Sequence, residues 1–259
     1  MKEYDFIIKT IQKAGKLLLQ KRNEGFSVMQ KNDDPRDIVT SVDKDINDFI
    51  IKEIKKEFPS HDIYSEESEN SEKTSDYKWT IDPIDGTANF SRNIPHFAVC
   101  IGLLKENVPV CGAVYNPITR ELFSFQKEKG AFLNNKPIYV SGIKELSKAH
   151  VLFHTGRKES LREWGGESYK ALLANAKKTE NFASSSLDSC FVATGRVEAN
   201  IYGTLSTLDI SPAIGILKEA GGIITDENGN DIKLSKDAKK VYTTNNKKIN
   251  SSLIELLEN

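Results

Sequence analysis

Residues 79–90, WTIDPIDGTANF, carry two aspartates, Asp82 and Asp85, within one short turn-like segment. The apolar and aromatic residues before them predict a strand. Pro83 has no N–H to donate and Gly86 accepts backbone conformations that other residues resist, so we expect the strand to end in a bend here. Two carboxylates at one bend repel each other, and burying them without a partner is costly. The stretch therefore predicts a bound cation, and hard divalent ions such as Mg²⁺ prefer oxygen ligands.

Further acids stand where the same cation can use them. The segment SEES (65–68) ends a short predicted strand, and LDISPA (208–213) places an aspartate where a helix is expected to begin, with Pro212 in its first turn. DIVTSVD (37–43) leads into another expected helix. Each fragment alone is weak, because a D-x-x-D turn is more often a solvated bend and an aspartate at a helix start is often a cap. The acids concerned are Asp37, Asp43, Glu66, Glu67 and Asp209.

Hydrophobic periodicity predicts the elements that carry these motifs. Apolar residues at three- and four-residue steps indicate helices over Tyr4–Arg22 and Val42–Phe58, with Ser41 as a candidate cap and Pro59 as the stop. Three apolar segments with Gly, Asn and Pro between them then predict an antiparallel meander: FAVCIGLL (97–104), VCGAVYNP (110–117) and ELFSFQ (121–126). Strands and helices alternate from about Ala149, which is typical of sheets layered with helices.

Composition limits the possible partners. The chain has 259 residues, 38% of them hydrophobic, enough for one large domain or two closely fused lobes. Because 36 Lys and Arg balance 37 Asp and Glu, there is no basic field to attract a nucleic acid polymer or a membrane surface. We find no apolar run of about 20 residues and no signal peptide, so a cytoplasmic protein is expected. Three cysteines without C-x-x-C spacing are expected to be buried apolar residues, and four scattered histidines to be packed or on the surface.

Together the motifs are recognisable. DPIDGTANF, preceded by EES and DIVTSVD and followed by LDISPAIGILKEAGG, resembles the inositol monophosphatase family of Mg²⁺-dependent, lithium-sensitive sugar and nucleotide phosphatases. The resemblance extends over nearly the whole chain through GAVYNP, EKGAF and CFVATG. It implies an α+β fold, a layered α-β-α-β-α sandwich of the sugar phosphatase type. It also implies a homodimer. From the expected packing we predict a single catalytic domain over 1–259, with a metal-binding α+β lobe over about 1–145 and an α/β lobe over about 146–259.

The resemblance also implies a ligand set. By similarity, Glu66, Asp82 and the backbone carbonyl of Ile84 would bind a first Mg²⁺, and Asp82 would bridge to a second ion held by Asp85 and Asp209. A third, weaker ion near Glu66 is common in the family, which makes two or three ions per active site. Paired ions can polarise phosphoryl oxygens and lower the pKa of a bound water, so a covalent phosphoenzyme is not required.

Other matched positions imply roles in catalysis and binding. Asp43 and Thr87 match the pair that orients the attacking water, with Glu67 supporting Thr87 or a metal-bound water. Gly86 and Thr87 would offer backbone N–H groups to the phosphate. Ala183, Ser184 and Ser185 match the loop that contacts the substrate ring.

The substrate is left open by one departure from the family pattern. Tyr202 stands where inositol-specific members have a glutamate, and a tyrosine can donate one hydrogen bond or stack on a base or sugar. We expect a phosphate monoester hydrolase acting on inositol monophosphate or a related sugar phosphate. The alternatives are a nucleotide phosphatase acting on 3′-phosphoadenosine phosphate or NADP(H), a fructose-1,6-bisphosphatase, and a non-catalytic regulator that binds metals or metabolites. A basic loop with Arg157, Lys158 and Arg162 would read a second phosphate, or is simply a solvated surface.

Overall fold

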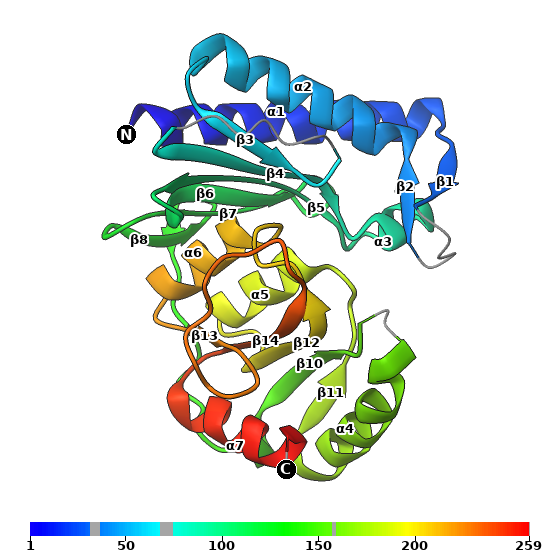
Figure 1. Cartoon of the computed structure of the whole chain (residues 1–259), viewed down its shortest axis with the longest axis vertical. Helices are drawn as coiled ribbons and strands as arrows, with labels where there is room; N and C mark the ends of the chain where they lie inside the picture. Colours follow the sequence, from blue (N-terminus) through cyan, green and yellow to red (C-terminus); the bar gives the residue numbers. More distant parts are fainter. Residues whose placement is uncertain (32–36, 68–74, 157–158, 259) are drawn as a thin grey trace.

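The computed structural model describes residues 1–31, 37–67, 75–156 and 159–258. Figure 1 shows five layers, two of them β-sheets and three of them helical, in the order α-β-α-β-α. The layered α+β sandwich predicted from the sequence is therefore confirmed. Within the described ranges, no helix is both long and apolar enough to cross a membrane.

The first layer consists of two long helices, α1 (Lys2–Glu24) and α2 (Ser41–Glu57). A small antiparallel pair, β1 (Val28–Gln30) and β2 (Ile38–Thr40), connects them. Both helices were predicted, but the proposed cap of α2 was wrong by one residue. Thr40 is the cap: its side chain accepts from the backbone N–H of Asp43, and Asp43 in turn accepts from the backbone N–H of Thr40. Ser41 is instead the first helical residue.

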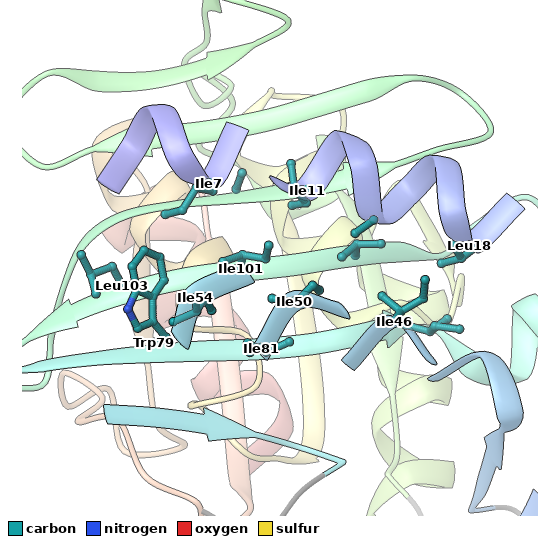
Figure 2. Packing of buried hydrophobic residues seen from close by; sticks show 14 of the residues in the cluster. Ile7, Ile11, Leu18, Ile46, Ile50, Ile54, Trp79, Ile81, Ile101 and Leu103 are labelled. Carbon is teal, nitrogen blue, oxygen red and sulfur yellow. The ribbon is translucent and has the colours of Figure 1, made fainter. Parts of the chain in front are cut away.

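The second layer is a seven-stranded sheet in which the strands follow chain order. β3 pairs with β4 in parallel, and every later pair is antiparallel, as predicted for the meander. Isoleucines from one face of α1 and one face of α2 pack on Trp79, Ile81 and Ile101 of this sheet (Figure 2). The strands are β3 (Asp62–Ser65), β4 (Tyr77–Asp85), β5 (Ala98–Lys105), β6 (Val108–Asn116), β7 (Glu121–Gln126), β8 (Gly130–Leu133) and β9 (Lys136–Pro137).

Residues 79–85 of the stretch WTIDPIDGTANF form the end of β4. The strand continues through Pro83 to Asp85, so the bend expected over Pro83–Gly86 comes at Gly86 and not at the proline. Its pairing with β5 shifts register between Asp82 and Asp85, and such an irregularity re-aims side chains locally. The chain then turns at Gly86, whose φ of 89° lies in the left-handed region that glycine adopts without strain. A short helix, α3 (Thr87–Ser91), follows at once.

Two helices, α5 (Ser185–Ala193) and α6 (Ser211–Glu219), form the middle layer between the sheets (Figure 1). The second sheet has the strand order β11-β10-β12-β14-β13. Helices α4 and α7, which form the fifth layer, cover its outer face (Figure 1). Its elements are β10 (His150–His154), β11 (Lys178–Glu180), β12 (Ala199–Leu205), β13 (Ile223–Thr225), β14 (Lys239–Thr244), α4 (Arg162–Asn175) and α7 (Lys247–Glu258). Two short 3-10 turns, η1 (Leu146–Lys148) and η2 (Glu159–Leu161), connect them to the rest of the chain.

The middle layer joins the two sheets through one apolar cluster. This cluster takes residues from both sheets and from both middle helices, for example Phe123, Leu152, Leu187 and Ile214. Cys100 and Cys190 belong to it, and all three cysteines are buried and free, as predicted. The two sheets are therefore held in a fixed relation, and the loops between them can form a site.

Candidate active site

The parallel pairing of β3 with β4 brings together acids that lie far apart in the sequence. Ser65 is paired with Ile81, and the backbone N–H of Glu66 donates to the carbonyl of Ile81 at 3.3 Å. A cavity of about 590 Å³ opens beside this strand end. It is lined by eleven of the residues predicted for the site: Asp37, Glu66, Asp82, Ile84, Asp85, Gly86, Thr87, Ala183, Ser185, Tyr202 and Asp209.

Asp82 stands at the centre of the acidic group. Its side chain is buried, and one carboxylate oxygen accepts from the backbone N–H of Ile84 at 3.0 Å. Burial raises the pKa of Asp82 well above its usual value, and the charges of Glu66, Asp85 and Asp209 raise it further. A carboxyl group with such neighbours is stabilised in its charged form when a cation is present.

The carboxylate of Asp85 is turned toward the start of α5. It accepts from the backbone N–H groups of Ser185 at 3.0 Å and Ser186 at 2.9 Å, from the Ser185 hydroxyl at 2.7 Å, and from the Ser184 hydroxyl. A negative charge is favourable at a helix N-terminus. Burial nevertheless outweighs these bonds and raises the pKa of Asp85. Ser184 and Ser185, predicted to contact substrate, thus hold an acid of the site.

Asp209 lies two residues before α6, whose cap is Ile210. Asp209 is therefore not the cap of that helix. One of its oxygens accepts from the hydroxyl of Tyr64 at 3.0 Å. Burial, followed by the charge of Glu66, raises the pKa of Asp209 to about 6.

Lys31 brings a cation to the edge of the acidic group, which the sequence analysis missed. Its Nζ lies 3.0 Å from Glu66 Oε1 and also contacts Glu67 Oε1. Burial disfavours the charged amine, but the two glutamates outweigh it and raise the pKa of Lys31. Lys31 directly follows β1 and lies 35 residues before Glu66 and 36 before Glu67, so no helix or strand period relates these positions. Glu67 thus pairs with Lys31, and burial raises the pKa of Glu67.

Asp43 and Thr87, the pair predicted to orient a water, lie within hydrogen-bonding distance of each other. The Thr87 hydroxyl lies 3.3 Å from Asp43 Oδ1 and 2.9 Å from the carbonyl of Ile84. The other oxygen of Asp43 accepts from Thr40, so the cap of α2 also fixes the orientation of this carboxylate. Burial raises the pKa of Asp43, which makes it a stronger base than a solvated aspartate.

The donor set fits a hard divalent cation. The site offers carboxylate and carbonyl oxygens, which Mg²⁺ prefers, and several of the carboxylates are buried close enough to raise one another's pKa. Among the described residues, no three His, Cys, Asp or Glu side chains converge in a metal-ligating group. The contacts above show why, since Asp85 points to α5 and Glu66 points to Lys31. The acids line one cavity, and the carboxylates of Asp85 and Glu66 are engaged by other partners.

A buried network adjoins Asp85 and contributes His154 and Tyr202 to the lining of the cavity. Asp188 of α5 accepts from His96 at 2.8 Å, from His154 at 3.0 Å and from the Tyr202 hydroxyl at 3.1 Å. The rings of His154 and Tyr202 stack with centroids 4.1 Å apart. Burial opposes the charge of Asp188, but its hydrogen bonds to the histidines lower its pKa below the usual value. The histidines were predicted to be packed or exposed, and nothing in their spacing indicated this network.

The remaining predicted residues have different surroundings. Ala183 lines the cavity in a left-handed conformation, φ 60°, which a non-glycine residue adopts only when its surroundings impose it. The side-chain amide of Asn89 donates to the backbone carbonyl of Phe182 at 2.7 Å and to that of Ala183 itself at 3.3 Å. Arg162 is exposed and pairs with Glu159 at 3.1 Å. Arg157 and Lys158 lie outside the described residues.

Comparisons with known proteins agree with this architecture. The family model described as the inositol monophosphatase family matches residues 2–259. Inositol monophosphatase 3 of Solanum lycopersicum is 36% identical over 252 residues, which cover 93% of this chain and 91% of that protein. Extragenic suppressor protein suhB from Bartonella henselae matches 100% of this chain and 99% of its own, with TM-score 0.92 and 28% identity. An IMPase from Thermotoga maritima matches 100% and 97%, with TM-score 0.91 and 28% identity.

Proposed function

The chain belongs to the inositol monophosphatase family and is therefore a phosphatase. On this premise we propose that it hydrolyses a small phosphorylated polyol with the help of Mg²⁺. Inositol monophosphate or a related sugar phosphate is the proposed substrate. The observation that carries the proposal is the single cavity that Glu66, Asp82, Asp85 and Asp209 line together with Thr87.

The four carboxylates and the backbone carbonyl of Ile84 would hold the Mg²⁺ ions. We propose that each active site binds two or three of these ions. The chemistry that Mg²⁺ supplies when bound is polarisation of the phosphoryl oxygens and acidification of a water molecule. Uncatalysed hydrolysis of phosphate monoesters is extremely slow, so a site without such a charge would lack most of the required stabilisation.

The chain's own residues then orient the water and the phosphate. Asp43 is fixed by Thr40 and contacts Thr87, so a water that contacts both groups from the cavity side would be aligned and could give a proton to the carboxylate. The turn at Gly86 brings backbone N–H groups to the cavity, where they would donate to phosphate oxygens. We propose Ala183 and Ser185 as the neighbours of the substrate ring.

The contacts of Tyr202 indicate a role different from that of a glutamate at this position. Its hydroxyl already donates to Asp188 and one face of its ring stacks on His154. We therefore propose that Tyr202 shapes the wall of the cavity and donates no hydrogen bond to the substrate. This leaves nucleotides and fructose 1,6-bisphosphate as alternative substrates that an assay must include.

The domain organisation, the oligomeric state and the location are proposals. We propose one catalytic domain over 1–259 with its two lobes dividing near residue 145, a homodimer, and a cytoplasmic location. The position of the division is supported by the two sheets, since the first ends with β9 at Pro137 and the second begins with β10 at His150.

Phosphate release from candidate substrates tests the proposal. We expect Mg²⁺-dependent release by the wild-type protein and its abolition by EDTA. Asp85→Asn should reduce kcat by on the order of 100-fold or more, since even residues beyond the direct ligands typically cost 10–100-fold. Asp48→Asn, an exposed position on α2, is the matched control and should keep its activity. Full turnover in Asp85→Asn, or turnover without a divalent ion, would contradict the assignment.

A further inference from the structure

One buried hydroxyl outside the cavity contacts an acid inside it. The Tyr64 hydroxyl donates to Asp209 Oδ1 at 3.0 Å, across 145 residues of chain. Tyr64 is not among the described residues that line the cavity, so it acts on the site through Asp209. We propose that Tyr64 is a positioning residue that fixes the orientation of the Asp209 carboxylate and thereby sets the affinity of the site for divalent cations.

The position of the Tyr64 hydroxyl is determined by packing. Tyr64 belongs to β3 and is paired with Thr80 of β4, two residues before Asp82. Its ring is 8% exposed and forms a small apolar cluster with Leu104 of β5 and Leu208. Leu208 is the residue next to Asp209, so the same cluster holds both the donor and the segment that carries the acceptor.

The chemistry of the donor suits a metal site. A hydroxyl orients a carboxylate without adding a positive charge, so it does not oppose a cation that binds to the same group. Lys31, in contrast, brings a charged amine to Glu66 and Glu67. Residues that hold metal ligands by hydrogen bonds typically change metal affinity or activity by 10–100-fold when they are removed. Tyr64 has the place and the chemistry of such a residue.

The inference rests on the proposed function, and Tyr64→Phe tests it by removing the hydroxyl and keeping the ring. The matched control is Tyr242→Phe, because the hydroxyl of the buried Tyr242 also donates to a carboxylate, Glu258 Oε1, at 2.5 Å, and Glu258 does not line the cavity. Each variant loses one partly buried hydrogen bond to an acid, so their losses of stability should be similar. Thermal unfolding of both variants checks this.

Two readouts distinguish a positioning role from a structural one. Mn²⁺ binding to the full chain without substrate, followed by electron paramagnetic resonance, should be about 10-fold weaker or more in Tyr64→Phe and within about twofold of wild type in Tyr242→Phe. The Mg²⁺ concentration for half-maximal phosphate release should rise in parallel, while kcat at saturating Mg²⁺ stays within a few-fold.

Equal Mn²⁺ affinities in the two variants would overturn the role of Tyr64 and leave the proposed function standing. A wild-type protein that binds no Mn²⁺ and releases no phosphate would overturn the proposed function, and this inference with it. Weaker Mn²⁺ binding in both variants would show a general effect of lost stability and would also refute the assignment.

Discussion

Asp209→Asn is expected to stabilise the metal-free protein while it impairs the site. The Asp209 side chain is partly buried near other acids, and this burial together with Glu66 raises its pKa from 3.8 to about 6. The charged form therefore costs free energy in the fold at neutral pH. Asparagine has nearly the same shape and keeps a carbonyl oxygen for the Tyr64 hydroxyl, but it carries no charge.

The size of the effect follows from the pKa. A shift of about two pK units corresponds to about 3 kcal/mol, which is the upper bound for the gain in the free energy of unfolding. For a chain of this length, each kcal/mol moves Tm by roughly 2–4 °C, so Tm should rise by up to roughly 10 °C.

The dependence on pH has a definite sign. Below about pH 3.8 the carboxyl is protonated in both the folded and the unfolded state, so the variant gains nothing from the lost charge. Between pH 3.8 and about 6 only the unfolded state ionises freely, so the penalty on the wild-type fold grows, and above about pH 6 it is complete. The advantage of the variant should therefore be full at pH 7.5 and vanish in acid.

Urea or thermal unfolding of EDTA-treated proteins at pH 7.5 measures the difference, with Asp48→Asn as the control for a lost surface charge. Mg²⁺ at 1,000 times its Kd should reverse the order, because it stabilises the wild type by about 4.1 kcal/mol, more than the gain of up to about 3 kcal/mol, and the variant binds it more weakly. An EDTA-treated Asp209→Asn protein that is no more stable than wild type would refute the claim that these acids oppose folding without a cation.

Two further substitutions test the packing around the site. In Gly215→Ala the new Cβ would lie 2.0 Å from the ring of Phe125, so α6 must move from the sheet, and we expect a loss of about 1–3 kcal/mol in urea unfolding; an unchanged midpoint would contradict the close packing. Asp188→Asn removes the charge that His96 and His154 hold, and a loss of about 3–5 kcal/mol is expected near neutral pH. Since the pKa of Asp188 is lowered in the fold, this difference should shrink as the pH falls below 4, and a loss that is independent of pH would argue against an ionised Asp188.

Local patterns in the sequence determined the elements and the identity of the acids. Apolar residues at three- and four-residue steps predicted α1 and α2 because one face of each helix must be buried, and Figure 2 shows those isoleucines on the sheet. The ordered motifs around Asp82 and Asp85 predicted the family, which the comparisons confirm. The cap of α2 was missed by one residue, since Thr40 and Ser41 are both good capping residues and the sequence does not distinguish them.

Tertiary structure alone decided where the acids point and what holds them. Lys31 meets Glu66, Tyr64 meets Asp209, and Asp188 meets His96 across long stretches of chain, and no period of helix or strand relates such positions. Which way a carboxylate turns depends on strand register and on the donors that packing brings within about 3 Å of it. Short-range periodicity therefore specifies the elements, whereas the competition among distant partners for each charged oxygen is settled only when the layers have closed around the cavity.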